Sequence, residues 1–424
     1  MTTAPKTAAP PADAGALDVD ALRKDFPLLA RTVHDRPIVY LDSAATSLQP
    51  RQVLAAMDHY YETTHANVHR GVYATAEEAT RLYEDARVAA GRFIGAPDPA
   101  HEVVFTKNTT EAINLVAHSW GRANLSRGDA VLLTEMEHHA NLVPWLMLAE
   151  SIGLELRYLP VDGDGRLDLA DLDQLLEGAK VLAITAMSNV LGTINPVPTI
   201  AEAAHRAGAV VVVDGAQSVP HLVTDVTTLG ADFLAFSAHK MQGPTGIGVL
   251  WARAELLDAM PPFLGGGGMI RDVSLTGFGP AEPPWRFEAG TPPIAEAVGL
   301  AAAVDYLSGV GMERVVAHER LLTAYAIEAL HERLGPDLTI FGPPAGGDRG
   351  GVLSVAYRDV HAHDLAQVLD QFGVCVRPGH HCAKPLMRRL GVAATARASI
   401  ALYNDERDID TLIEGLNHVG TVFG

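Results

Sequence analysis

The stretch AVVVVDGAQSVPHLVTDVTTLGADFLAFSAHK, residues 209–240, contains two short apolar runs, Ala209–Val213 and Asp232–Phe236. Runs that are apolar throughout, rather than alternating with polar residues, are typical of parallel strands buried on both faces of a sheet. Ligands of such sheets bind beyond the carboxyl ends of the strands, so polar residues directly after an apolar run are candidates for function. Here those residues are Asp214, Gln217, Ser237, His239 and Lys240.

The same pattern continues on both sides of this stretch, from Leu41 to about Leu250. Short apolar or β-branched runs alternate with helix-like segments rich in Ala, Glu and Leu, which is the rhythm of a parallel sheet covered by helices. The further candidate strands are Glu102–Thr106, Ala130–Thr134, Leu154–Leu159, Val181–Ala186 and Gly246–Trp251. The sequence therefore predicts an α/β fold whose large domain contains a mostly parallel seven-stranded sheet.

Composition shifts along the chain predict its division into domains. Pro261–Pro293 is rich in Gly and Pro and is expected to form irregular loops, after which a long Ala-rich helix begins near Ile294. The expected parts are a disordered tail (1–18), an N-terminal segment that packs with the small domain (19–40), a large sheet domain (41–293) and a smaller C-terminal α+β domain (294–424).

The overall charge and the cysteine count exclude several classes of protein. The 424 residues include 32 Lys and Arg against 51 Asp and Glu, a formal charge of −19, which disfavours binding to nucleic acid or to anionic membranes. Two cysteines, Cys375 and Cys382, cannot form a disulfide scaffold and lack a Cys-x-x-Cys spacing. No apolar stretch approaches the roughly 18 residues of a membrane span. We therefore expect a cytoplasmic protein in a reducing compartment.

Asp214 and Lys240 suggest a specific chemistry at the carboxyl end of the sheet. A buried carboxylate needs a cationic partner, and a protonated pyridine nitrogen is one such partner. A lysine at a neighbouring strand end can form a Schiff base with an aldehyde on the same ring. The alternative for these two residues alone is an ordinary Asp–Lys ion pair at the edge of the sheet.

A segment after the first predicted strand suggests an anion site. In KNTTEAIN, residues 107–114, Thr109 and Thr110 open a helix, where backbone N–H groups and hydroxyls can hold a phosphate. The alternative is a threonine that caps the helix without any ligand. Ser237 and His239 could supply further donors, and His138 could lie over a planar ring. An anion site, a ring-nitrogen partner and a Schiff-base lysine together are what pyridoxal 5′-phosphate requires.

The two cysteines have different surroundings in the sequence. Cys382 follows Gly379-His-His in a predicted loop, where a thiol beside imidazoles can be a nucleophile, whereas Cys375 lies in an apolar run and is expected to be packing. The His pairs 138–139 and 380–381 lack the spacing of a chelating motif, so we expect no metal site. Arg397 could bind an α-carboxylate bidentately, the alternative being a solvated arginine.

Eight segments of the chain resemble fold-type I pyridoxal-phosphate enzymes of the class V aminotransferase group, and within it the group II, SUF-type cysteine desulfurases. They occur in family order after the N-terminal tail: LDSAAT (41–46), ANVHRG (66–71), TTE (109–111), EHHAN (137–141), DGAQ (214–217), SAHKMQGPTGIG (237–248), RPGHHCA (377–383) and RASIALYN (397–404).

The resemblance implies a role for each candidate residue. Lys240 would carry the cofactor aldehyde as a Schiff base. The other implied cofactor contacts are Asp214 with the pyridinium nitrogen, Gln217 with the ring hydroxyl, His138 stacked on the ring, Asn189 near the ring oxygen, Thr109, Thr110, Ser237 and His239 with the phosphate, and Thr291 with the phosphate of the partner subunit. Arg397 and Asn189 would position the substrate, Cys382 would be the catalytic thiol, and His138 a proton shuttle. A homodimer with composite active sites follows from the role of Thr291.

The implied reaction converts L-cysteine to L-alanine and leaves a persulfide on Cys382. The resemblance further implies that the sulfur passes to an acceptor protein of the SufU or SufE type for iron–sulfur cluster assembly. Three alternatives stay open: a selenocysteine lyase or cysteine sulfinate desulfinase of the same fold, a different class V enzyme such as an epimerase or aminotransferase, and a non-enzymatic sulfur carrier, which would leave Lys240 and Asp214 without a purpose.

Overall fold

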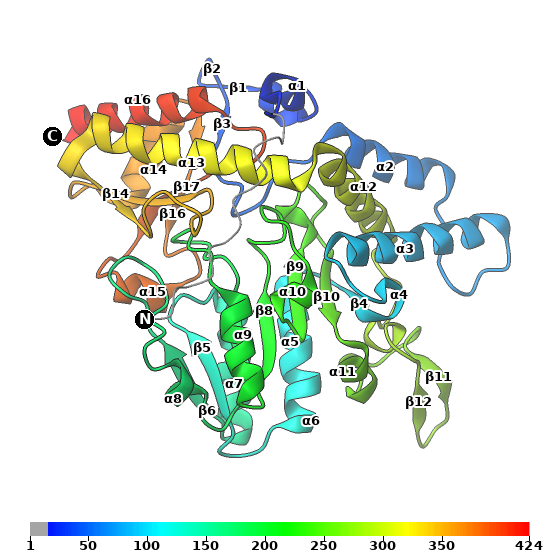
Figure 1. Cartoon of the computed structure of the whole chain (residues 1–424). Helices are drawn as coiled ribbons and strands as arrows, with labels where there is room; N and C mark the ends of the chain where they lie inside the picture. Colours follow the sequence, from blue (N-terminus) through cyan, green and yellow to red (C-terminus); the bar gives the residue numbers. More distant parts are fainter. Residues whose placement is uncertain (1–15, 424) are drawn as a thin grey trace.

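The computed structural model describes residues 16–423 (Figure 1). The first fifteen residues of the expected tail lie outside this range. The described chain begins just before α1 (Val19–Arg23), whose N-terminus is capped by the Asp18 carboxylate accepting from the Ala21 N–H at 3.0 Å.

The large sheet has seven strands, and the expected α/β fold is confirmed. In sheet order they are β4 (Val103–Thr106), β10 (Gly248–Ala252), β9 (Phe233–Ser237), β8 (Val210–Asp214), β7 (Ala179–Thr185), β5 (Ala130–Thr134) and β6 (Glu155–Leu159). The sequence predicted every one of them to within two residues at either end. Six of the strands run in the same direction, while β10 is antiparallel to both of its neighbours, β4 and β9.

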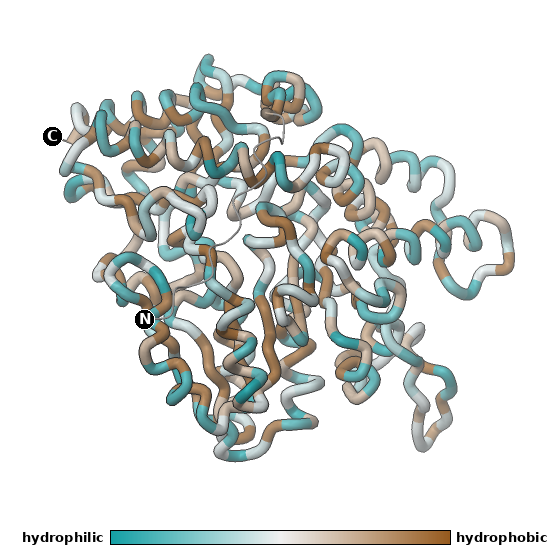
Figure 2. Tube along the Cα trace, in the orientation of Figure 1, coloured by the Kyte–Doolittle hydropathy of each residue, from teal (hydrophilic) through white to brown (hydrophobic). Residues whose placement is uncertain are grey.

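Successive residues of the central strands face two different apolar cores. On β7, Leu182 and Ile184 belong to one core and Val181 and Ala183 to the other, which is why the strand is apolar throughout. The first core includes α3 (Ala74–Phe93), α9 (Val197–Arg206) and α12 (Ile294–Val310), and the second includes α5 (Thr109–Leu115), α7 (Val143–Ile152) and α11 (Ala254–Ala259). Figure 2 shows the brown strands enclosed between paler or teal helices.

Among the described residues, five further helices belong to the part of the chain that contains the large sheet. They are α2 (Arg51–Thr63), which packs on α12, and α4 (Pro99–Glu102), α6 (Arg122–Asn124), α8 (Leu172–Leu176) and α10 (Val226–Leu229). Between α5 and α6 the helix continues as a π-helical stretch, Val116–Gly121.

A second sheet of four antiparallel strands lies toward the C-terminus. Its order is β13 (Leu338–Phe341), β14 (Val352–Tyr357), β17 (Thr395–Ser399) and β16 (Arg377–Gly379). Three helices share its core: α13 (Met312–Leu334), α14 (Ala362–Asp370) and α16 (Glu406–Phe423). The helix α15 (Lys384–Arg389) instead contributes Leu386 and Met387 to the first core of the large sheet.

Two features of the region around residue 294 differ from the sequence prediction. The helix α12 begins at Ile294 as expected, but its apolar residues pack with α2 and α3 in the core of the large sheet. Apart from Val39 and Leu41 of the N-terminal segment, the small-domain core begins at Leu322, within α13, so the division between the cores does not coincide with the expected boundary at 293/294. The Gly/Pro-rich segment before α12 also contains a hairpin, β11 (Ile270–Val273) with β12 (Phe278–Pro280), which projects from the body of the molecule (Figure 1).

The N-terminal segment contacts both parts of the chain. After a small hairpin, β1 (Thr32–Val33) with β2 (Arg36–Pro37), the strand β3 (Val39–Tyr40) pairs in parallel with β15 (Val374–Cys375), while Phe26 packs in the core of the large sheet. The N-terminal segment therefore contacts both the core of the large sheet and the strand β15 near the C-terminus.

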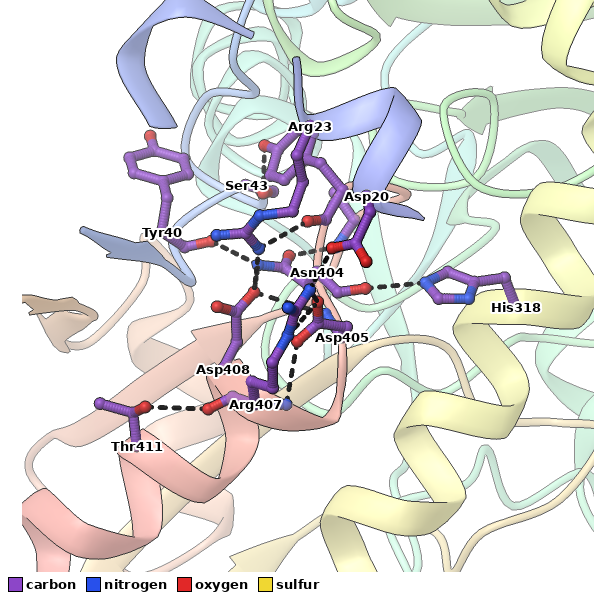
Figure 3. Close-up of polar contacts among 12 residues, drawn as sticks. Asp20, Arg23, Tyr40, Ser43, His318, Asn404, Asp405, Arg407, Asp408 and Thr411 are labelled. Carbon is purple, nitrogen blue, oxygen red and sulfur yellow. Dashed lines mark hydrogen bonds and ion pairs between the residues drawn. The ribbon is translucent and has the colours of Figure 1, made fainter. Parts of the chain in front are cut away.

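Polar contacts reinforce this connection (Figure 3). Arg23 donates to the Tyr403 carbonyl at 3.0 Å and to the buried Asp408 carboxylate at 2.9 Å. The Asn404 amide donates to the Tyr40 carbonyl at 3.0 Å and to Asp408 at 2.8 Å. Because Asn404 and Asp408 follow β17, this network fixes the N-terminal segment on the strand that carries Arg397.

We expect Asp408→Asn to lower the free energy of unfolding by about 1–3 kcal/mol, because it removes the charge that compensates the partly buried Arg23. Glu414→Gln on the same helix is the matched control. Its pair with Arg36 is exposed on both sides, so a loss below about 0.5 kcal/mol is expected. Chemical denaturation of both variants measures the difference, and equal losses would contradict the assignment.

Within residues 16–423, no single helix is long and apolar enough to cross a membrane. One bent pair, Ile294–Val310 with Met312–Asp337, meets that test by length and composition, with 73° between its arms.

Candidate active site

One cavity lies at the carboxyl ends of the central strands of the large sheet. It encloses ≈ 760 Å³, its open mouth included. It brings together eleven of the residues singled out in the sequence: Thr109, Thr110, His138, Asn189, Asp214, Gln217, Ser237, His239, Lys240, Cys382 and Arg397. They come from seven separate stretches of the chain, which the parallel strands and the C-terminal sheet place around one space.

Asp214 and Lys240 follow neighbouring strands, at the end of β8 and just after β9. Asp214 is buried and accepts one hydrogen bond, from the Ala216 N–H at 2.9 Å. Burial raises the pKa of Asp214, and burial lowers the pKa of the Lys240 amine to about 8. Among the described residues the two form no ion pair, which disfavours the simple Asp–Lys bridge. The carboxylate and the amine are therefore both available to a group in the cavity.

Gln217 supports the fit of pyridoxal 5′-phosphate. Its amide nitrogen donates to the Ala44 carbonyl at 2.8 Å, whereas its buried Oε1 has no hydrogen-bond partner within the described part of the chain. An unpaired buried acceptor is costly, and a ring hydroxyl would satisfy it. With Asp214 and Lys240, the donor set fits the nitrogen, the hydroxyl and the aldehyde of the cofactor.

The turn before α5 has the form of a phosphate site. Asn108, not a threonine, caps the helix by accepting from the Glu111 N–H at 3.0 Å, which leaves both threonines inside the first turn. The Thr109 N–H and hydroxyl lie 2.8 and 2.6 Å from the Ser237 hydroxyl. Gly248 makes this approach possible, since a Cβ there would lie 2.5 Å from the Asn108 Cα.

The Cys382 loop has a strained backbone that is held on several sides. His381 and Cys382 have φ of 50° and 56°, a left-handed conformation that costs about 1 kcal/mol or more for each non-glycine residue. The Cys382 carbonyl accepts from the His139 N–H at 2.7 Å, and its N–H donates to His380 Nδ1 at 3.0 Å. These bonds hold the thiol at the wall of the cavity that Lys240 also lines.

Asn189 and Arg397 are joined to each other and to this loop. The side-chain amide of Asn189 donates to the His381 carbonyl at 2.8 Å, and the backbone carbonyl of Asn189 accepts from Arg397 at 3.0 Å. Arg397 is buried, which excludes the solvated alternative, and burial lowers its pKa to about 10. Its second partner is Asp42, at 3.2 Å. Asn189 thus bonds to the loop in addition to lining the cavity.

Two further residues belong to the site, and Thr291 lies elsewhere in the single chain. Arg377 lines the cavity five residues before Cys382, and Asp42 neutralises Arg397. In the sequence, the one feature that could have indicated these two residues is their position directly after an apolar run. Thr291 is exposed and lines a different cavity, with Lys107 and Glu111.

The His138 imidazole is neutral at physiological pH. Its Nδ1 accepts from the Ala140 N–H at 3.0 Å, and burial together with the Lys240 charge lowers its pKa to about 3. An unfolded chain binds this proton below about pH 6.5, whereas the folded chain does not, so stability falls as the pH falls through that range.

We therefore expect the free energy of unfolding of cofactor-free protein to fall less steeply in His138→Asn than in wild type, by roughly 2 kcal/mol between pH 7 and pH 5. Urea titrations at both pH values measure it. Parallel pH profiles of the two proteins would show that the folded imidazole titrates normally.

Known proteins share both the sequence and the fold of this chain. The family model of class V aminotransferases matches residues 39–412. A probable cysteine desulfurase of Streptomyces coelicolor is 52% identical, over 97% of this chain and 99% of its own length. A cysteine desulfurase of Haloferax volcanii is 50% identical, over 96% of this chain and 98% of its own.

Two solved structures extend the comparison. The apo cysteine desulfurase of Thermococcus onnurineus has a TM-score of 0.90 and 43% identity, covering 94% of this chain and 97% of its own. The S-sulfonic acid form of CsdA from Escherichia coli has a TM-score of 0.88 and 39% identity, covering 96% and 100%. The class V aminotransferase family predicted from the sequence is confirmed. The chain belongs to the class V aminotransferase family of pyridoxal-phosphate enzymes, and it is similar to cysteine desulfurases over nearly its whole length.

Proposed function

We propose that this protein is a cysteine desulfurase that converts L-cysteine to L-alanine and receives the sulfur on Cys382. The observation that carries the proposal is the common cavity of Lys240, Asp214, Arg397 and Cys382. The cavity brings together an amine that can hold the cofactor aldehyde, a carboxylate that can pair with a protonated ring nitrogen, a guanidinium that can bind the substrate carboxylate, and a thiol that can take the sulfur.

Each group has a defined task. When bound, pyridoxal 5′-phosphate supplies an electron sink for bonds at the substrate Cα and Cβ. Arg397 binds the substrate carboxylate, and Asn189, bonded to the Arg397 guanidinium, keeps it aimed into the cavity. The free Lys240 amine, with its pKa lowered to about 8, takes the Cα proton at near-neutral pH.

The sulfur transfer requires Cys382 as a thiolate. The Cys382 Sγ attacks the substrate sulfur. A sulfur–sulfur bond forms as the bond between the Cβ and the sulfur of the substrate breaks. The electron pair of the broken bond stays with the carbon skeleton, which gains protons at Cβ and Cα and leaves as L-alanine. The enzyme retains a persulfide, and a thiol acceptor completes the cycle by taking its outer sulfur.

The direct test incubates purified holoprotein with L-cysteine and a thiol reductant. Alanine and sulfide are expected in equal amounts. L-selenocysteine and L-cysteine sulfinate are the comparison substrates, since both can lose their Cβ substituent without attack by a thiol. Failure to form alanine from L-cysteine, with rapid turnover of either comparison substrate, would replace the proposal by the corresponding lyase or desulfinase.

We infer further that the enzyme is a homodimer and passes its sulfur to an acceptor of the SufU or SufE type. The exposed position of Thr291, outside the cavity of its own chain, supports a role in the partner's site. The charge of −19 suits an acceptor with a basic docking face. The need for a reduced thiol supports the expected cytoplasmic setting. Light scattering measures the mass, and alanine formation with and without each acceptor tests the transfer.

A further inference from the structure

A buried ion pair lies outside the catalytic cavity and has no part in the mechanism above. Arg87 on α3 has a fully buried side chain, and Glu288, just before the Gly290-Thr291-Pro292 segment, is nearly as buried. Two parallel hydrogen bonds join them: Arg87 Nη1 to Glu288 Oε1 at 2.6 Å and Nη2 to Oε2 at 2.9 Å. This bidentate geometry is the strong form of the pair.

Glu288 also binds the edge of the large sheet. Its Oε1 accepts from the Phe105 N–H of β4 at 2.7 Å, and its Oε2 accepts from the Tyr83 hydroxyl at 2.8 Å. Within residues 16–423, β4 is an edge strand that pairs only with β10, so this N–H faces away from the sheet. Arg87 binds the same strand through the Val103 carbonyl at 2.9 Å. The ion pair therefore forms the backbone hydrogen bonds with the free edge of β4 that a neighbouring strand would otherwise form.

The two segments joined by Glu288 both lead to threonines that we propose as phosphate contacts. Thr109 follows Phe105 by four residues, at the first turn of α5. Thr291 follows Glu288 by three residues, and Glu288 and Thr291 line one cavity with Lys107 and Glu111. A second carboxylate, Glu84, binds Arg87 Nε at 2.8 Å and fixes the guanidinium from the other side.

We infer that Glu288 is a positioning residue for the phosphate end of the cofactor, acting through β4 on Thr109 of its own chain and through the adjoining segment on Thr291. The inference rests on cofactor binding at Lys240 and on the proposed role of Thr291 in the partner's site. Phosphate binding by backbone and hydroxyl donors depends on their exact spacing, so an anchor on both segments affects the phosphate and not the ring.

Pyridoxal, which has the same ring and aldehyde but no phosphate, separates positioning from general stability. Full-length protein freed of cofactor is titrated with pyridoxal 5′-phosphate and with pyridoxal, and the Schiff-base absorption gives both dissociation constants. Glu288→Gln places an NH₂ group against the donors of Arg87 and Tyr83. We expect it to weaken the phosphate compound about tenfold and to leave pyridoxal unchanged.

Asp408→Asn is the matched control, because it also removes a buried carboxylate from an arginine pair but lies on α16. The quantity compared is the dissociation constant of pyridoxal divided by that of pyridoxal 5′-phosphate. In Asp408→Asn this ratio is expected to equal that of wild type even though the protein is less stable. Tyr83→Phe, which removes one donor to Glu288 and keeps the ion pair, is the gentler variant, and its ratio should fall about threefold.

A wild-type ratio in Glu288→Gln overturns the inference, as does an equal fall in Asp408→Asn. If Glu288→Gln does not fold, the ratio in Tyr83→Phe decides in the same way. A wild-type protein that forms no Lys240-dependent band with either compound overturns the inference together with the cofactor assignment, so the two failures are distinguishable.

Discussion

Cys382→Ala is expected to keep the cofactor and to lose alanine formation from L-cysteine by at least about 10³-fold, because the attacking nucleophile is gone. The loop should survive the change, since its hydrogen bonds to His139 and His380 use the Cys382 backbone and not the thiol. The cofactor absorption band reports the first part of the prediction, and alanine quantified over time reports the second.

Cys375→Ala is the control for the only other cysteine of the chain. Cys375 lies in β15 beside Tyr40, outside the residues that line the cavity, and burial raises its pKa to about 11. A thiol so seldom ionised near neutral pH is a poor nucleophile, so turnover should stay near the wild-type value. Full turnover by Cys382→Ala, or loss in Cys375→Ala alone, would contradict the assignment of the persulfide to Cys382.

Lys240→Ala is expected to remove the visible absorption band of the purified protein and to lower alanine formation by at least about 10³-fold. The variant loses both the amine that holds the aldehyde and the base that takes the Cα proton. The buried Asp214 and the donors around Thr109 remain, so the variant should still bind the cofactor non-covalently. Absorbance spectra before and after dialysis, with alanine assays, measure both effects.

Lys180→Ala provides the lysine control, because Lys180 is exposed on β7 at the opposite end from the cavity. Its spectrum and turnover should match those of wild type. A visible band that persists unchanged in Lys240→Ala would place the Schiff base on another amine.

Local pattern was sufficient for the sheet and for much of the site. The apolar runs at 210–213 and 233–236 have to be buried on both faces, and the polar residues after them then fall at one edge of the sheet. The sequence alone could for that reason place Asp214 and Lys240 in a common site. The antiparallel direction of β10 had no local signal, because an apolar run has the same composition in either direction.

Contacts between distant residues decided the rest. Nothing near Arg397 in the sequence distinguishes a buried guanidinium from a solvated one, and only the approach of Asp42 and Asn189 from other segments offsets the free-energy cost of its burial. The place of α12 in the large core, against α2 and α3, is likewise invisible in an Ala-rich helix that is apolar on most sides.

The amino-acid sequence was enough to predict the succession of strands along the chain, the family and the residues that line the common cavity, because burial and strand-end position are properties of short segments. The tertiary structure alone decided how those residues are held: the His381 carbonyl by Asn189, Arg397 by Asp42, and the free edge of β4 by Glu288 and Arg87. Each of these bonds joins residues more than fifteen positions apart, and their partners are chosen by packing that no local pattern encodes.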